Sequence, residues 1–468
     1  MAMVHIVADR LHLWGIETER AVANFTISGE PFPADVIRWL ARLKSAAASV
    51  NADLGLLSIG LANEIRQAAE SIEAGKHNDQ FPVDVFQTGS GTSTNMNMNE
   101  VISTLTDHRA HPNDHVNLGQ SSNDVMPTAV QLAACESITS KLLPATRNLA
   151  ATLRQKGTEF SHVVKPGRTH LMDALPVLMG DEFDSYAAQI DDCTQATKAS
   201  LEALARVPLG GTAVGTGVGT VPDFAERVIQ IVTDLDRLGI SPTIAISRLA
   251  AQASHDSLVA TSATLNTLAV ALTKICNDLR WMASGPKTGL GEITIAALQK
   301  GSSIMPGKVN PVVPEIVLQV AAQVIGNHVT ITVAGMQGNF ELNVMLPVMT
   351  RNLLQSINLL AASCDALAND CVATITVNES HCRQLAIRSS ATATVLNRAL
   401  GYDTVEQIVR EAERSGRGIQ AVATEHGVSP ELIAEIDIDR VARVAGSPSP
   451  ATPKSKTPAS SPDSGLCK

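Results

Sequence analysis

The stretch that decides the fold runs from residue 258 to residue 282 and reads LVATSATLNTLAVALTKICNDLRWM. Its large apolar side chains recur at steps of seven, three and four residues, which is the heptad spacing of a helix packed along one side. At 1.5 Å per residue, this stretch predicts a helix about 37 Å long. The apolar positions are Leu258, Leu265, Leu268, Leu272, Ile275, Leu279 and Met282.

Similar helical patterns occur on both sides of this stretch. They cover residues 121–157, 177–206 and 313–334, and a further pattern over 35–75 follows the helix-breaking Pro33. Several of these segments are apolar on most faces, which is typical of helices surrounded by other helices. The sequence therefore predicts an all-α bundle whose surplus apolar surface is buried against other subunits.

The pattern also predicts a division along the chain. An N-terminal, mainly helical domain is expected over 1–119, the long-helix bundle over 120–378 and a small helical domain over 379–445. Residues 446–468 are dominated by Ser, Pro, Thr and Ala, and such a segment cannot offset its ordering entropy. We expect it to be a disordered tail.

Composition excludes several classes of function. The net charge of −10 and the lack of a basic stripe argue against nucleic acid, although a small anionic substrate needs only a few local donors. The seven cysteines form no CxxC pair, which indicates reduced thiols in a cytoplasmic protein and gives no support to an iron–sulfur site. No signal peptide is predicted. Because the apolar stretches are interrupted before about 18 residues, no membrane span is predicted either.

Two polar segments lie in the first third of the chain. Residues 88–99 read TGSGTSTNMNMN and offer neutral hydroxyl and amide donors, although a surface turn also fits this composition. Residues 120–124 read QSSND at the head of an apolar run, which predicts a helix N-cap and a place for a carboxylate. His108, His111 and His115 are spaced like metal ligands, but Pro112 breaks a helix there. We therefore predict no metal site.

Two further polar segments follow. In GRTH (167–170), His170 is a candidate general acid or base with a helix expected after it, although a lone His is more often structural. Residues 301–315 combine Gly301 and Gly307, two serines and the fixed charge of Lys308. This composition predicts a tightly turned anion-binding loop.

Together these segments resemble the fumarase/aspartase superfamily from about residue 14 to residue 445. The strings GSSIMPGKVNP (301–311), GRTHLMD (167–173) and QSSND (120–124) are similar to those of the class II, iron-independent fumarases. Aspartases tend to read MPAKVNP in the first string and to carry Gln in place of His170. The resemblance implies reversible hydration of fumarate to L-malate without metal or organic cofactor. It also implies a three-domain fold and a homotetramer with a 20-helix core and active sites shared between subunits.

Residue roles carry over from the same resemblance. Ser302 matches the base that removes the C3 proton of malate, and Lys308 supplies the positive charge at the carboxylate. His170, paired with Glu315, matches the group that activates the water or protonates the leaving hydroxyl. The implied substrate-binding residues are Ser90, Thr92, Ser121, Ser122, Asn123, Thr169, Ser303, Lys308 and Asn310. The implied second anion site consists of His111, Asn113 and Asp114.

Some positions depart from the family pattern. Glu17 and Glu19 replace two glutamines, Gly219 replaces a common Asn, and the stretch between residues 100 and 111 is shorter than usual. These differences leave room for lowered activity or a shifted substrate. The alternatives are an aspartate ammonia-lyase or another fumarate-releasing lyase of the same superfamily, or a non-catalytic structural paralogue.

Overall fold

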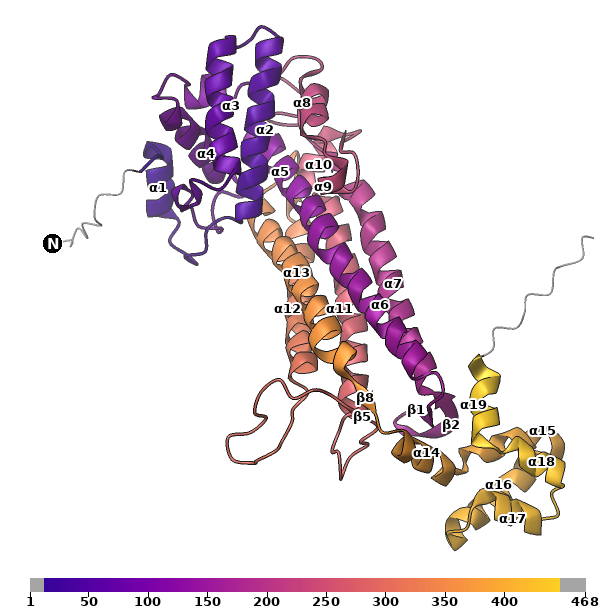
Figure 1. The fold of residues 1–468 in the computed structure, drawn as a ribbon. Coiled ribbons are helices and arrows are strands. Elements are labelled where there is room, and N and C mark those ends of the chain that lie inside the picture. Colours follow the sequence, from indigo (N-terminus) through magenta and orange to yellow (C-terminus); the bar gives the residue numbers. More distant parts are fainter. Residues whose placement is uncertain (1–11, 447–468) are drawn as a thin grey trace, which may run out of the picture. The chain divides into compact units, whose positions relative to one another are not determined.

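The computed structural model describes residues 12–446, which form two compact units (Figure 1). The first comprises residues 12–156 and 184–376, and the second comprises residues 157–183 and 377–446. The four-part division along the sequence stays a prediction. Residues 447–468 of the expected tail lie outside the described residues.

The first unit begins with helices of mixed length. They are α1 (Ile16–Asn24), α2 (Ala34–Asp53), α3 (Ile59–Glu73), η1 (Asn78–Gln80), α4 (Thr92–Leu105) and η2 (Pro112–Val116). The helical pattern over 35–75 is confirmed as the pair α2 and α3. Gly55, with φ +73°, lies in the turn between them, and Ser58 caps α3 by accepting a hydrogen bond from the backbone N–H of Leu61.

The bundle helices follow. They are α5 (Ser122–Ser137), η3 (Ile138–Leu142), α6 (Leu143–Glu159), α7 (Met179–Leu204), α11 (Asp256–Met282), α12 (Val312–Gly335), α13 (Leu346–Ala366) and η4 (Leu367–Cys371), with α6 and α7 extending into the second unit. The η3 and η4 helices are five-residue segments that continue α5 and α13. Every apolar position of the 258–282 pattern is buried. The α11, α12 and α13 helices pack against one another, so the predicted bundle is confirmed.

Shorter elements connect these helices. They are β3 (Arg206–Val207), α8 (Phe224–Val232), α9 (Leu235–Leu238), β4 (Thr243–Ile244), α10 (Arg248–Ala253), β5 (Ile293–Thr294), β6 (Gly338–Asn339), β7 (Leu342–Asn343), η5 (Val372–Thr374) and β8 (Thr376–Val377). The β3 and β4 strands pair in parallel, whereas β6 and β7 form an antiparallel hairpin.

The second unit joins a β-hairpin to a group of short helices. The antiparallel hairpin consists of β1 (Val164–Thr169) and β2 (Met172–Leu178). The helices are α14 (Glu379–Arg388), η6 (Ser390–Leu396), α15 (Asn397–Leu400), α16 (Tyr402–Ser415), α17 (Ile419–Glu425), α18 (Pro430–Glu435) and α19 (Ile438–Gly446). The expectation of a helix directly after His170 is wrong, because β2 intervenes and α7 begins only at Met179.

Two bundle helices are more apolar than the sequence reading indicated. By length and composition alone, α11 and α12 would be able to cross a membrane. The interrupted stretches did not predict this, because single polar residues within a long helix leave its average apolar character high. In the most apolar 18-residue stretch of α12, only 28% is buried against other parts of this chain.

Candidate active site

The loop from Gly301 to Pro311 leads directly into α12 and is closed at its base. The backbone N–H of Gly301 donates to the carbonyl of Lys308 at 3.0 Å, and Asn310 Nδ2 donates to the carbonyl of Gly301 at 2.7 Å. A Cβ at residue 301 would collide with the Lys308 carbonyl, and Gly307 has φ +77°. Both glycines are therefore required by the backbone path, as the sequence predicted.

Within this loop, the Ser302 hydroxyl is held in a cradle of backbone donors. Its Oγ accepts hydrogen bonds from the N–H of Ile304 at 3.2 Å and of Met305 at 3.0 Å. Donors aimed at an oxygen favour its charged form, so this arrangement stabilises a serine alkoxide. The loop borders a hollow of about 590 Å³ lined by residues 297–309.

The charge of this loop comes from Lys308. Its side chain is exposed, and no carboxylate among residues 12–446 forms an ion pair with it. The ammonium is thus available to an anionic ligand. Ser303 is exposed beside Ser302, and Glu315 is half-buried in the first turn of α12.

Two other polar segments meet in the first unit, where α4 and α5 begin. Ser90 Oγ and Thr92 Oγ1 are 2.7 Å apart, and Gly91 caps α4 in the left-handed conformation. Ser122 Oγ lies 3.0 Å from the side-chain amide of Asn95, one turn into α4. The structure therefore brings the 88–94 segment and the QSSND segment together.

The QSSND segment is a capped helix start, as predicted. The Ser121 side chain accepts from the backbone N–H of Asn123, and Asp124 Oδ1 accepts from the N–H of Ser121. Asn123 Nδ2 donates to the carbonyl of Ala213 at 2.8 Å. The second Asp124 oxygen accepts from the N–H groups of Gly210 and Thr212, so this buried carboxylate ties the cap to a neighbouring loop.

The residues expected at a second anion site lie nearby in sequence, on the turn η2. His111 Nδ1 accepts from the backbone N–H of Asp114 at 3.1 Å and lies 3.2 Å from its carboxylate. Asn113 is exposed on the same turn. Within residues 12–446, no group of three or more His, Cys, Asp or Glu side chains is gathered so that it could hold a metal ion.

His170 and Thr169 belong to the second unit. Thr169 pairs with Met172, which leaves His170 and Leu171 as a two-residue turn with φ values of 56° and 61°. Positive φ at both positions is the geometry of a type I′ hairpin turn. The hairpin tip thus presents an exposed imidazole next to the Thr169 hydroxyl.

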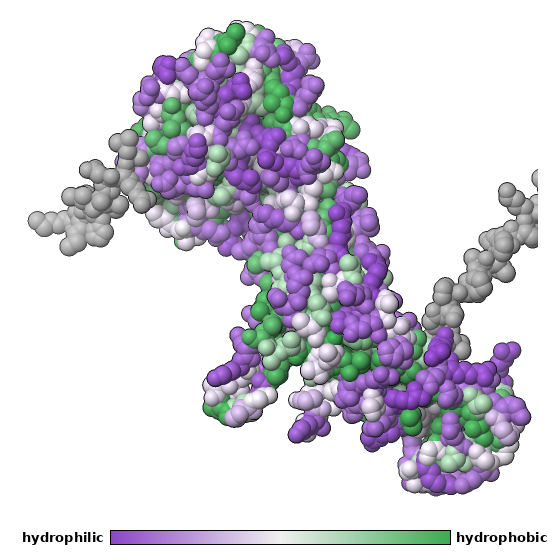
Figure 2. All heavy atoms as spheres, viewed as in Figure 1, coloured by the Kyte–Doolittle hydropathy of each residue, from purple (hydrophilic) through white to green (hydrophobic). Residues whose placement is uncertain are grey.

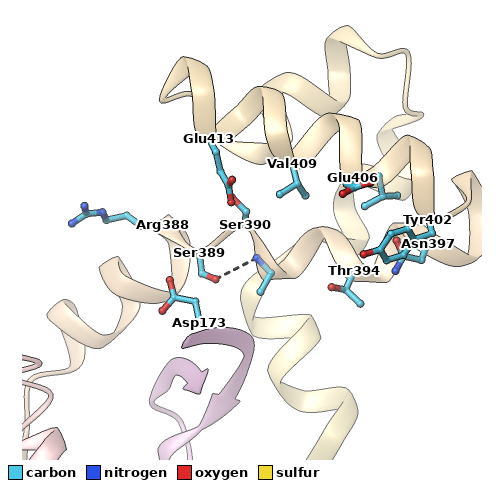
Figure 3. Close-up of a pocket in the computed structure, with 12 residues that line it drawn as sticks. Asp173, Arg388, Ser389, Ser390, Thr394, Asn397, Tyr402, Glu406, Val409 and Glu413 are labelled. Carbon is cyan, nitrogen blue, oxygen red and sulfur yellow. Dashed lines mark hydrogen bonds between the residues drawn. The ribbon is translucent and has the colours of Figure 1, made fainter. Parts of the chain in front are cut away.

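A different cavity, of about 430 Å³, lies in the second unit between the hairpin and the helices α14 to α16 (Figure 3). Its charged lining consists of Arg388 and the carboxylates of Asp173, Glu406 and Glu413. Because the lining holds three carboxylates and only one guanidinium, its net negative charge repels a dicarboxylate. It does not suit the anionic substrate that the other segments predict.

Within the first unit, the Ser302 loop and the Thr92 segment lie at opposite ends of α12. The loop precedes the first residue of this helix. At its other end, the Gly89 carbonyl accepts from the N–H of Leu346, and a Cβ at residue 89 would collide with the carbonyl of Val344. A helix of 24 residues is about 36 Å long. One small ligand therefore cannot touch both segments of the same chain.

Sequence reasoning missed the residues behind the polar segments. The buried side chains of Asn95 and Lys44 both donate to the half-buried Asn117, and Asn95 also donates to Ser122. Lys44 lies in an alanine-rich helix and has no motif around it that separates it from a surface lysine. Asp124, by contrast, stands three residues after Ser121 in a capping-box pattern that could have predicted its contact with the cap.

With this geometry established, comparisons with known proteins define the class. The lyase family matches residues 5–326. The fumarate hydratase class II of Mycobacterium tuberculosis (strain CDC 1551 / Oshkosh) is 48% identical over 431 residues, which cover 92% of this chain and 91% of the relative. The fumarate hydratase class II of Xylella fastidiosa (strain Temecula1) is 48% identical over 417 residues, which cover 88% of each chain.

Solved structures agree with the sequence relatives. The class II fumarase from Schistosoma mansoni superimposes with a TM-score of 0.89 at 35% identity and covers 92% of this chain and 96% of that chain. The fumarate lyase:delta crystallin from Brucella melitensis, solved bound to cobalt, gives 0.87 at 40% identity with the same coverage. This chain belongs to the class II fumarase family. The predicted family and all-α fold are thereby confirmed.

Proposed function

We propose that this chain is a fumarate hydratase, which interconverts fumarate and L-malate, a step of the tricarboxylic acid cycle. The observation that carries the proposal is the pair of hydrogen bonds to Ser302, in which two backbone N–H groups favour a charged oxygen on the same loop as the exposed cation Lys308. A fumarate hydratase needs this combination, because it must remove a weakly acidic proton next to a carboxylate.

In the dehydration direction, the Ser302 alkoxide takes the C3 proton of malate. The electron pair left at C3 delocalises into the adjacent carboxylate as an aci-carboxylate, whose extra charge Lys308 and the second N–H of Asn310 stabilise. The pair then forms the C2–C3 double bond as the C2–O bond breaks. His170, held by Glu315, gives its proton to the leaving hydroxide, so that fumarate and water are released and the charges balance.

The second carboxylate of the substrate is bound by hydroxyl and amide donors at the starts of α4 and α5. We assign it to Ser90, Thr92, Ser121, Ser122 and Asn123, with Thr169 and Ser303 completing the enclosure. The positive end of the helix dipole lies at a helix start and favours an anion there. His111, Asn113 and Asp114 are assigned to a separate anion site nearby. This scheme uses no metal or organic cofactor.

A homotetramer is part of the proposal. The ends of α12 separate the Ser302 loop from Thr92 by about 36 Å within one chain, so a complete site requires more than one copy. The α12 helix leaves Ile325, Val329 and Val333 exposed at steps of four residues, and Figure 2 shows apolar side chains gathered along one side of the long helices. A second copy running antiparallel along this face would bring the two ends together.

The cytoplasm is the proposed location. Six cysteines are buried in the part of the chain that the structure describes, which suits a reducing compartment. Neither a membrane nor nucleic acid has a part in the proposed reaction.

The test is a paired assay on the purified chain. Absorbance near 240 nm, where fumarate absorbs, is followed with L-malate and then with L-aspartate. Turnover of malate supports the proposal. Turnover of aspartate alone would assign the chain to the ammonia-lyases, and turnover of neither would favour a non-catalytic paralogue.

A further inference from the structure

A lysine lies fully buried beneath the polar segments of the first unit. Lys44, on α2, has no exposed side-chain surface, and its ammonium donates to Asn117 Oδ1 at 2.9 Å. Burial lowers the pKa of Lys44 to about 7, whereas the charge of Asp124 raises it. No carboxylate among the described residues forms an ion pair with Lys44. A buried ammonium bound to a neutral amide is costly, so its position calls for a reason beyond packing.

The amide of Asn117 collects three donors on one oxygen. Besides Lys44, Asn117 Oδ1 accepts from Asn95 Nδ2 at 3.1 Å and from Asn99 Nδ2 at 3.3 Å, and its own Nδ2 donates to the carbonyl of Gln120. Lys44 donates to this oxygen, and the Gln120 carbonyl can only accept from Asn117 Nδ2. Lys44 and the Gln120 carbonyl therefore fix together which way the Asn117 amide points.

That orientation is passed to Asn95 and from there to Ser122. Because Asn117 presents an oxygen, Asn95 must turn its NH2 toward it, since the reversed amide would place two oxygens against each other. The same NH2 group donates to Ser122 Oγ at 3.0 Å. Ser122 Oγ is thus an acceptor on its buried side, and its own proton is free to point outward.

We propose that Lys44 is a positioning residue that sets the direction of this hydrogen-bond chain, so that the Ser122 hydroxyl donates to a substrate carboxylate. The inference rests on the proposed function, which places Ser122 against that carboxylate. Lys44 does not touch the substrate and acts only through Asn117 and Asn95. Its removal should weaken binding and leave the chemical step intact, because Ser302 and Lys308 are on a different loop.

The experiment compares steady-state kinetics with L-malate for the full-length wild type and two Lys44 variants. Lys44→Met removes the donor, and KM should rise about tenfold, the cost of one misdirected hydrogen bond to a charged group, while kcat stays within about twofold. Lys44→Gln keeps a neutral donor, and its KM should return to within about threefold of wild type.

Two further variants keep the test decisive. Lys156→Met removes another buried lysine of the first unit, which donates to the carbonyl of Ile375, and it should leave KM unchanged. If Lys44→Met does not fold, as judged by circular dichroism and solution mass, Asn95→Leu breaks the chain one step later and should raise KM by a similar factor.

The possible outcomes separate the two proposals. If the wild type does not turn over malate, the proposed function is wrong. This result is obtained before any variant is made. With an active wild type, an unchanged KM in Lys44→Met, or a fall in kcat alone, overturns the role of Lys44. Equal losses in Lys44→Met and Lys44→Gln would also overturn it, because they would make the charge, rather than the direction of the chain, the relevant property.

Discussion

The hydroxyl oxygen of Ser302 accepts a hydrogen bond from the backbone N–H of Met305, three residues along the same loop, at 3.0 Å. A serine is ordinarily far too weak a base to take a proton from carbon. Two N–H groups aimed at its oxygen, with Lys308 on the same loop, reduce the cost of the alkoxide. The short loop thus carries both the base and the charge that its reaction needs.

Removing this oxygen should abolish the chemical step. Ser302→Ala is expected to lower kcat for malate by about a thousandfold or more with little change in KM, because the residue acts on the reacting C–H bond rather than in binding. Ser303→Ala, at the next position, should chiefly raise KM. A Ser302→Ala enzyme that keeps a tenth or more of the wild-type kcat would rule out Ser302 as the base.

The N-terminal helix depends on one buried carboxylate. Glu100 accepts hydrogen bonds from the backbone N–H groups of Gly15, Glu17 and Thr18, and from the Thr18 hydroxyl. A glutamine offers only one acceptor oxygen, so Glu100→Gln should lower the free energy of unfolding by about 2 kcal/mol in a denaturant titration. Glu17→Gln, at an exposed ion pair, serves as control and should change it by less than about 0.5 kcal/mol.

Acid stability should depend on His255, which is buried at the N-cap of α11. Burial lowers the pKa of His255 to about 4, from 6.5 for the free side chain. Between pH 4 and pH 6.5, His255 therefore binds a proton in the unfolded chain but not in the native chain. Stability is therefore lost as pH falls from about 6.5 to about 4, by up to about 3 kcal/mol from this residue.

His255→Asn isolates this contribution. The position has φ +56°, which asparagine tolerates, and the variant cannot gain the proton. The unfolding free energy of the wild type minus that of the variant should therefore decrease as the pH is lowered from about 6.5 to about 4. The comparison is needed because burial raises the pKa of Asp124 to about 6, which stabilises the native state on acidification over part of the same range. A pH-independent difference would contradict the prediction.

The cysteines should be inert in the native protein. Cys135, Cys364 and Cys371 are buried, and burial raises the pKa of each thiol to about 12. In a chain carrying Cys467→Ser, a thiol reagent should label less than about one cysteine per chain over an hour, because thiolates are both scarce and inaccessible. Denaturation should then expose the six buried cysteines. Rapid labelling without denaturation would show that the bundle opens readily.

The long helices were predictable from sequence because their apolar positions repeat. Leu265, Leu268 and Leu272 follow the heptad steps, and each is buried in α11. The β1–β2 hairpin was not predictable in the same way. Its turn uses His170 and Leu171 at positive φ, where the usual signal is Asn-Gly or Asp-Gly. The strand also contains Pro166 and Gly167, both of which argue against a strand.

For the site, the sequence identified the loops but not what lies behind them. Gly301, Gly307 and Ser121 carry local signals of turn and cap, and the structure places them in those roles. The orientation of Ser122 depends on Lys44, which is 78 residues away along the chain, and no local pattern encodes that contact. Gly219 departs from the family Asn, yet its φ of +93° is a conformation that glycine adopts readily.

The most direct test of the account is complementation between two inactive variants. Ser302→Ala removes the base, and Ser122→Glu places a carboxylate at the first residue of α5, where it suits the helix but excludes the substrate. If each site draws these two segments from different chains, each segment is intact in about half of the sites of a randomly mixed tetramer. Both segments are then intact in about a quarter of the sites, so about a quarter of wild-type activity should be recovered. Recovery near that level is the predicted result. Mixed tetramers as inactive as either parent would show that one chain supplies both segments, which contradicts the account.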